Sequence, residues 1–290
     1  GDSNTAIGRV ALFENTTGGS NTAVGMNCML DNTTGGSNTA VGESALSNNT
    51  TASNNIAIGH NALVANTTGA QNTSVGTISG DANTTGSENA SLGYWSLTEN
   101  TTGNYNVALG SRSLKSNTTA SNNTAVGYQS LYANTTGSEN TAVGRLALDA
   151  NTTGTNNTAM GNGALGANTT ASYNTAMGEQ AGAANTTGTR QVAIGAYALD
   201  ANTVGTDIVA VGYQALTTYN RTSGASKVVG IGNGAFYSLT TGTQNTAVGH
   251  EAGYNQTNDN NSAFLGYRAG HGVTTGSRNT CVGSLAGQNI

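Results

Sequence analysis

The sequence predicts an all-β fold, a β-solenoid (parallel β-roll) of seventeen 17-residue coils. Three observations predict it: a phrase close to Asn-Thr-Ala-Val-Gly recurs along almost the whole chain, nearly every recurrence comes 17 residues after the last, and none of the 290 residues is proline. A two-helix repeat needs about 33 to 47 residues. Asn, Thr and Gly are also poor helix formers. Short extended segments joined by turns therefore fit the period.

A glycine ends each phrase, and its position defines the start of each repeat. It stands at positions 8, 25, 42, 59, 76, 93, 110, 127, 144, 161, 178, 195, 212, 232, 249, 266 and 283. All steps are 17 residues except the step of 20 between Gly212 and Gly232. Because successive coils of a solenoid pair in parallel, we expect each coil to lie in register with the next.

The longer step divides the chain into three stretches. We expect a regular array over residues 1–212, an irregular coil with a three-residue insertion over 213–231, and variant coils of the same solenoid over 232–290. The insertion falls around Tyr219, Asn220, Arg221 and Ser223. Such an insertion is expected to form a loop that bulges from its coil.

Four columns of the aligned repeats are restricted in residue type. The residue before the glycine is apolar in all seventeen repeats, which predicts a buried column, and the residue before that is Ala in twelve. Three and four positions after the glycine, Ala occurs in twelve repeats and Leu in ten. These pairs predict two inward-facing extended segments in each coil. Near the end of the chain Gly253, Gly270 and Gly287 replace Leu, which predicts thinner coils.

Residues on a strand alternate between its two faces, so the strict Ala and the apolar residue after it should face opposite ways. Both faces are therefore restricted, and we expect one to pack the coil and the other to pack another chain. Replacing Ala125 by Leu should then overpack one of these two contacts.

A turn asparagine forms the longest unbroken polar column. It comprises Asn15, Asn32, Asn49, Asn66, Asn83, Asn100, Asn117, Asn134, Asn151, Asn168, Asn185 and Asn202. Stacked amides can hydrogen-bond from coil to coil, so we expect a structural ladder. The surrounding Asn-Thr-Thr-Gly phrase predicts a turn with a left-handed glycine, altered where Ala52 replaces it. Eleven of the twelve also match the N-glycosylation pattern, which a repeat of Asn and Thr produces by itself.

Composition and charge exclude several classes of function. Only 8% of residues are charged and the net charge is −5 with nine basic residues, which leaves no basic stripe for nucleic acid. No apolar run approaches the roughly 18 residues that span a bilayer, so we expect no membrane insertion of this segment. The chain opens at Gly1 without a signal-like segment, which favours a soluble, processed or excised piece.

Candidate catalytic and metal-binding residues do not cluster in the sequence. His60 and His250 occupy the same coil position about eleven coils apart, and His271 stands alone. We therefore expect no metal, no cofactor and no enzymatic activity. Cys28 and Cys281 replace Ala in two different columns, which predicts small buried thiols rather than a disulfide.

Aromatic residues gather at variable positions where the repeat does not require them. Tyr94 and Trp95 follow one glycine, and Tyr128 and Tyr132 lie two coils later, about 10 Å along the stack. Exposed rings at that spacing could stack on successive sugars, so these four residues are candidate ligand contacts. The alternative is that the rings cover apolar stems or pack against a neighbouring chain.

The phrases at 4–8, 55–59 and 106–110 closely resemble the repeats in the heads of trimeric autotransporter adhesins. The form around Tyr128 and Tyr213 also resembles repeat shafts of phage tail fibres and related surface fibres. The resemblance implies a left-handed roll, three chains side by side, and a location outside the cell, on a cell or virion surface.

We therefore expect a non-enzymatic structural or adhesive fibre segment that forms or projects a receptor-binding surface. Its partners would be itself, as a homotrimer, and a host cell-surface glycan or protein. Two alternatives remain open. One is an extracellular filament subunit that joins end to end, and the other is an ice-binding solenoid with its Thr pairs in the Asn-Thr-Thr turns.

Overall fold

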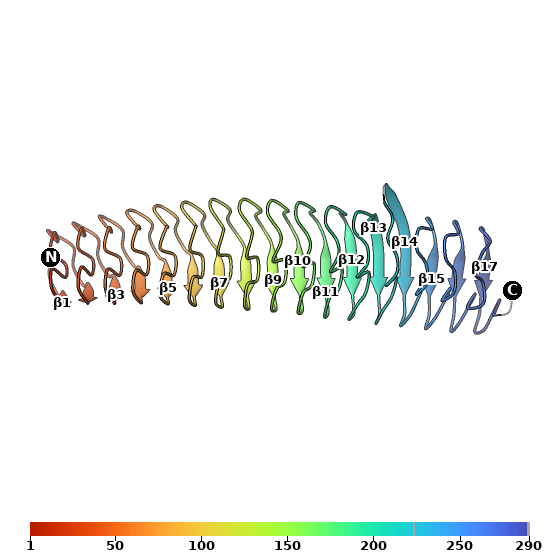
Figure 1. The fold of residues 1–290 in the computed structure, drawn as a ribbon. Helices are drawn as coiled ribbons and strands as arrows, with labels where there is room; N and C mark the ends of the chain where they lie inside the picture. Colours follow the sequence, from red (N-terminus) through yellow and green to blue (C-terminus); the bar gives the residue numbers. More distant parts are fainter. Residues whose placement is uncertain (223, 289–290) are drawn as a thin grey trace. The chain divides into compact units, whose positions relative to one another are not determined.

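The computed structural model describes residues 1–222 and 224–288 and confirms the all-β parallel solenoid (Figure 1). Of the insertion residues expected to bulge, Ser223 lies outside the described part. The chain forms two compact units, Gly1–Asn140 and Thr141–Ile290. Within the described residues, no helix has the length and apolar character to cross a membrane.

One short strand marks each coil, and within each unit every strand pairs in parallel with the strand of the next coil. The first unit holds β1 (Thr5–Ile7), β2 (Thr22–Val24), β3 (Thr39–Val41), β4 (Ile56–Ile58), β5 (Thr73–Val75), β6 (Ala90–Leu92), β7 (Val107–Leu109) and β8 (Thr124–Val126). The second holds β9 (Thr141–Val143), β10 (Thr158–Met160), β11 (Thr175–Met177), β12 (Gln191–Ile194), β13 (Thr206–Val211), β14 (Ala225–Ile231), β15 (Thr246–Val248), β16 (Ala263–Leu265) and β17 (Thr280–Val282).

The expectation of two extended segments per coil is wrong. The Ala-Leu segment after the glycine is a run of turns in which left-handed residues alternate with ordinary ones, as at Ser44 (φ 56°) and Leu46 (φ 53°). Its backbone still bonds to the next coil, because Leu46 N–H donates to the Ala62 carbonyl at 2.9 Å. Coil-to-coil bonding therefore continues around the turn without β geometry.

The expected burial of the residue before the glycine is also wrong. In β2 the inward residue is Ala23, which is fully buried, whereas Thr22 and Val24 on either side are only half-buried. The core of the first coils is instead built from the Ala column and the Ala-Leu segment, including Ala40, Ala45 and Leu46. The apolar residue before each glycine belongs to the outer face of the strand.

Ala125 has the same inward position in β8 and no exposed surface. The overpacking expected from Ala125→Leu would therefore act on the interior of its own coil. The outer face of this strand carries Thr124 and Val126, both half-buried in the single chain.

The strand-closing glycine has a steric cause. Gly25 has φ +141°, a conformation that side chains rarely adopt. A Cβ placed there would overlap the carbonyl of Gly42, the same residue one coil on. Both restrictions recur along the column, which explains why it contains only glycine.

The turn glycine behaves differently from the expectation. Gly35 does not have a positive φ, and Ala52 replaces it in the next coil without changing the bond made there. Asn32 Nδ2 donates to the Gly35 carbonyl and Asn49 Nδ2 to the Ala52 carbonyl, both at 3.0 Å. A Cβ at Gly35 would overlap the Ala52 carbonyl, so close packing against the next coil, and not a left-handed φ, restricts this position.

The irregular step is absorbed at β13 and β14, the two longest strands. Thr206 pairs with Ala225, but Ile208 pairs with Val228, so the register shifts by one residue between them. Tyr219 occupies the position of the turn asparagine, is fully buried, and donates from its hydroxyl to the Gly242 carbonyl at 3.0 Å.

The coils after the irregular step are filled differently rather than thinned. Phe236 and Phe264 are buried there with ring centroids 5.9 Å apart. A Cβ at Gly253 would lie 2.6 Å from Phe236 and 2.7 Å from Phe264. Two phenyl rings therefore take the volume that leucine fills elsewhere, and the neighbouring glycines make room for them.

Candidate functional site

The turn asparagines bond from coil to coil inside the solenoid. Asn49 Nδ2 donates to Asn32 Oδ1 at 2.7 Å and to the Ala52 carbonyl at 3.0 Å. Its own Oδ1 accepts from Asn66 Nδ2 at 3.1 Å. Every polar atom of this buried side chain thus has a partner, which removes the cost of burying an amide.

This arrangement repeats through most of the column. In the first unit the amides of Asn32, Asn49, Asn66, Asn83, Asn100, Asn117 and Asn134 each donate to the asparagine one coil earlier. In the second unit Asn168 donates to Asn151 and Asn185 to Asn168. Because both amide hydrogens are used inside the coil, attachment of a sugar to these nitrogens is incompatible with the folded chain.

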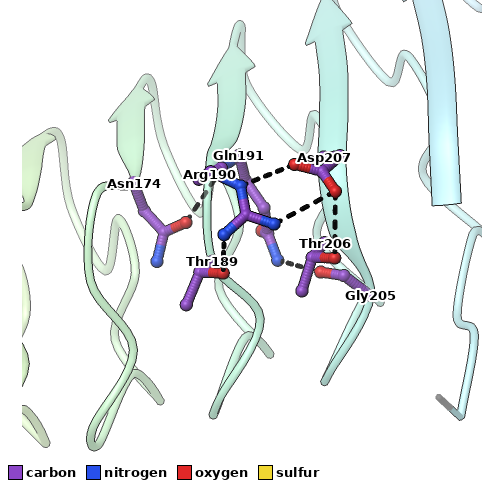
Figure 2. Close-up of polar contacts among 7 residues, drawn as sticks. All are labelled: Asn174, Thr189, Arg190, Gln191, Gly205, Thr206 and Asp207. Carbon is purple, nitrogen blue, oxygen red and sulfur yellow. Dashed lines mark hydrogen bonds and ion pairs between the residues drawn. The ribbon is translucent and has the colours of Figure 1, made fainter. Parts of the chain in front are cut away.

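The ladder changes at Gln191, which replaces the asparagine that opens most Asn-Thr-Ala-Val-Gly phrases. Gln191 Nε2 donates to Asn185 Oδ1 at 2.9 Å and to the Gly205 carbonyl at 2.6 Å. Asn202 turns to its own loop and donates to the Gly205 carbonyl at 3.2 Å. Figure 2 shows the longer side chain of Gln191 reaching to Gly205.

A second amide column was not predicted. Asn38, directly before β3, is fully buried, and its Oδ1 accepts from the backbone N–H of Asn55 at 2.9 Å. Its Nδ2 donates to the Ala52 carbonyl at 2.9 Å, the group that also accepts from Asn49. The signal was the asparagine that opens most Asn-Thr-Ala-Val-Gly phrases, a position as regular as the turn asparagine.

The outer strand face forms an apolar stripe, defined here as the residue before each closing glycine. In the first unit it consists of Ile7, Val24, Val41, Ile58, Val75, Leu92, Leu109 and Val126, all half-buried or exposed. Ile7 and Leu92 keep 59% and 51% of their surface in the single chain. In the second unit the same column runs through Val143, Met160, Met177, Ile194, Val211, Ile231, Val248, Leu265 and Val282.

A column of half-buried and exposed apolar side chains on a regular strand face makes this stripe the candidate interaction surface of the chain. No enclosed pocket accompanies it within the described residues. Any partner of this face would therefore meet an open surface.

The predicted aromatic residues lie in the first unit, and two of them touch directly. Tyr94 stacks on Trp95 with ring centroids 5.2 Å apart and 17° between the ring planes. Arg112 lies 5.5 Å and Lys115 5.8 Å from the Trp95 ring centroid. Trp95 is therefore held among neighbouring side chains, and Tyr94 is the more exposed ring of the pair.

Lys115 lies between Trp95 and Tyr132, another of the four predicted residues. Its ammonium lies 5.7 Å from the centroid of Tyr132 and forms a 2.6 Å ion pair with Glu99. Burial raises the pKa of nearby Asp81, and Glu99 raises it further while Lys115 opposes the shift. The charge of Lys115 is thus already compensated inside the protein.

Tyr128 does not join this group of ring contacts. It is exposed, as Tyr94 is, and both residues directly follow a strand-closing glycine. Their coils are separated by one coil, in which Ser111 takes the same position. Tyr94 and Tyr128 are therefore exposed members of one column, whereas Trp95 and Tyr132 pack against basic side chains.

An exposed ion pair between Arg190 and Asp207 connects two coils of the second unit (Figure 2). Arg190 Nε donates to Asp207 Oδ1 at 2.7 Å, and a second guanidinium nitrogen donates to Oδ2 at 3.1 Å. The hydrogen bond from Arg190 lowers the pKa of the Asp207 carboxyl, and Asp207 raises the pKa of the guanidinium. Because the pair is solvent-exposed, its role is local.

Stacked rings also run along the last coils, which the sequence analysis did not predict. Tyr237 stacks on Tyr254 at 4.8 Å, and Tyr254 stacks on His271 at 5.3 Å. All three lie five positions after a closing glycine, so alignment of the repeats places these rings one above another and could have predicted the stack. Glu251 binds Arg268 at 2.7 Å and lies 3.4 Å from His271.

No cluster of three or more His, Cys, Asp or Glu side chains suited to a metal occurs in residues 1–222 or 224–288. Cys28 and Cys281 are both free and buried. Burial raises the pKa of the Cys28 thiol to about 11, although a backbone hydrogen bond opposes the shift.

Comparison with models of known protein families gives no match for this chain. Comparison with curated proteins also gives no similar sequence. What the chain does must therefore be argued from its fold and surfaces, which are those of a parallel β-solenoid built of repeats of about 17 residues.

Proposed function

We propose that this chain is a structural, non-enzymatic segment of an adhesive fibre displayed outside a cell or on a virion, and that it assembles as a homotrimer. The observation that carries the proposal is the apolar stripe on the outer strand face. Its residues are hydrophobic in every coil, yet they remain half-buried or exposed in the single chain.

The energetics of the stripe support association. Covering the exposed part of one Val, Ile or Leu side chain gives roughly 1 kcal/mol at about 25 cal/mol per Å² of apolar surface. The eight coils of the first unit would together contribute about 8 kcal/mol before the cost of association. Neighbouring copies carry the same stripe at the same coil spacing, so a second copy of this chain fits it in register.

The number three rests on the resemblance of the repeat phrases to trimeric autotransporter adhesin heads and tail-fibre shafts. That resemblance also favours a left-handed roll, an extracellular location and a receptor on a host surface. A chain in which only 8% of residues are charged, and whose turn threonines are partly exposed, suits an exposed fibre segment.

Sedimentation equilibrium of the whole chain at micromolar concentration tests the assembly, with two lysine variants. Val41 lies in the stripe, whereas Glu43 is exposed two residues later. Val41→Lys would bury a charge in each interface and should lower the mass toward that of one chain, while Glu43→Lys should leave a mass of three chains. A stable wild-type monomer would overturn the proposal, and a mass that keeps rising with concentration would favour end-to-end filament growth instead.

A second candidate function uses the same face. Thr22 lies outward at the start of β2, beside Val24, and most strands of both units begin with Thr. Rows of Thr and Val at coil spacing on a flat strand are the type of surface that an ice-binding solenoid requires. This differs from the turn threonines considered from the sequence. The test is the thermal hysteresis of freezing, measured for wild type and for the unassembled Val41→Lys protein. Hysteresis in both proteins would favour ice binding, and no hysteresis in either protein would exclude ice binding.

A further inference from the structure

We propose that Tyr94, Tyr128 and Arg112 in the first unit form a binding site for an acidic glycan chain that lies along the coil stack. This inference rests on the proposed function, because it names the ligand class that such a displayed segment would meet. Tyr94 and Tyr128 directly follow the closing glycines of their coils, and Arg112 lies two positions after the closing glycine of the coil between them.

The two tyrosines give the site its spacing. Both are exposed, at 47% for Tyr94 and 44% for Tyr128, and they hold the same position two coils apart. Two coil steps correspond to about 10 Å. Alternate rings of an extended polysaccharide repeat at a similar distance, so each tyrosine could receive one sugar face. Ser111, which holds this position in the middle coil, adds a hydroxyl between them.

Arg112 gives the site its charge preference. Its guanidinium lies 5.5 Å from the Trp95 ring centroid, and no carboxylate within the described residues forms an ion pair with it. Lys115, the other cation on Trp95, is bound to Glu99 at 2.6 Å. Arg112 is therefore the cation free to pair with a carboxylate or sulfate of the ligand, with the planar geometry that favours two parallel hydrogen bonds.

Trp95 acts as a positioning residue in this arrangement. It stacks on Tyr94 at 5.2 Å and lies beneath Arg112, so it fixes both groups. Its indole N–H is buried and makes no hydrogen bond to the described residues. The aromatic contact and the cation are thus ordered before a ligand arrives, which lowers the entropic cost of binding.

Titration of the whole assembled protein with soluble polysaccharides tests the site. The probes are polygalacturonate, neutral dextran of similar length, and poly-glutamate. Binding of each probe is measured by calorimetry and by the fluorescence of Trp95, the only tryptophan in the sequence. We expect saturable binding of polygalacturonate that weakens with salt, and at least about tenfold weaker binding of dextran and poly-glutamate.

Three site variants and one control sharpen the test. Arg112→Gln should weaken polygalacturonate binding about tenfold and remove the preference over dextran. Tyr94→Ala and Tyr128→Ala should each weaken binding of both polysaccharides severalfold. Tyr105→Ala is the control, because Tyr105 is exposed at 54% in the same unit but lies outside this column.

The outcomes separate this inference from the proposed function. Equal binding by Arg112→Gln and wild type, equal affinity for poly-glutamate, or no binding of polygalacturonate would overturn the acidic-glycan site. The mass of each sample, measured by sedimentation, reports assembly independently. A trimer without binding overturns only the glycan site, whereas a monomer that binds overturns only the trimer.

Discussion

Asn49 Nδ2 donates a 2.7 Å hydrogen bond to Oδ1 of Asn32, which holds the same position one coil earlier. Both side chains are fully buried, so this bond lies in the interior and not on a solvated turn. Part of the solenoid interior is therefore polar, and its stability depends on complete pairing of amides. The Ala-Leu segment supplies the apolar part.

Loss of one ladder amide should be costly. Asn49→Ala leaves Asn32 Oδ1 and one Nδ2 hydrogen of Asn66 without their partner and removes one of the two amide donors to the Ala52 carbonyl, so we expect the free energy of unfolding to fall by about 2 to 3 kcal/mol. Urea unfolding measures this change. Asn48→Ala is the matched control, because Asn48 is exposed, and it should change stability by less than about 0.5 kcal/mol. Equal effects of the two variants would show that the ladder does not stabilise the fold.

Two glycines of one coil should respond differently to alanine. Gly161 has φ +139°, and a Cβ there would overlap the Gly178 carbonyl, so Gly161→Ala should destabilise by about 3 kcal/mol or prevent folding. Gly163 has φ +65° and its nearest neighbouring atom would lie 3.8 Å from the added Cβ. Gly163→Ala should therefore cost only the left-handed φ, about 1 to 2 kcal/mol, and a loss by thermal unfolding as large as that of Gly161→Ala would contradict this steric account.

The last coils offer a double-variant test of packing. Gly270→Leu alone should fold poorly because the added side chain would overlap the Phe264 ring, while Phe264→Ala alone should leave a cavity costing about 3 to 5 kcal/mol. The double variant restores the Ala and Leu found at these positions elsewhere. We therefore expect it to be more stable than either single variant, by urea unfolding. Simple additivity of the two losses would contradict the exchange of volume.

Cys28 should make stability fall at alkaline pH. Its thiol has a pKa of about 11 when folded and 9.0 as the ordinary value, so the unfolded chain releases its proton first. Stability is then unaffected by this group below about pH 9 and decreases between about pH 9 and 11. Cys28→Ala restores the usual residue and should remove this part of the pH dependence. Identical pH profiles for the two proteins, measured by urea unfolding, would refute it.

The period and parallel register could be predicted from the sequence because every coil repeats the same spacing. Which strand side chains point into the core could not be predicted from hydrophobicity alone. Val24 is more apolar than Ala23, yet Ala23 is inside, because only a small side chain fits the narrow interior between the strand and the Ala-Leu turns. The left-handed φ of Leu46 was also hidden, since leucine rarely adopts it and tertiary packing enforces it here.

The aromatic group shows a similar division. The variable positions indicated four candidate residues, Tyr94, Trp95, Tyr128 and Tyr132. The structure adds that Arg112 and Lys115 lie over the ring of Trp95. Arg112 holds the column of Trp95 one coil later, whereas Lys115 lies three positions further along that coil. Alignment by columns places residues one above another but does not show which long side chains lean across to a neighbouring column.

The bonds between successive turn asparagines and the strand pairs of a regular coil lead to the same position in the next coil, 17 residues away. Removing residues 32–48 from the gene would bring Asn15 beside Asn49, and each lost contact would be remade by the residue that holds the same column one coil later. Gain or loss of whole seventeen-codon segments should therefore be nearly neutral for folding, while any shorter insertion misaligns both amide columns at once. Replication slippage can thus change the number of coils in a lineage far more easily than it can change their design.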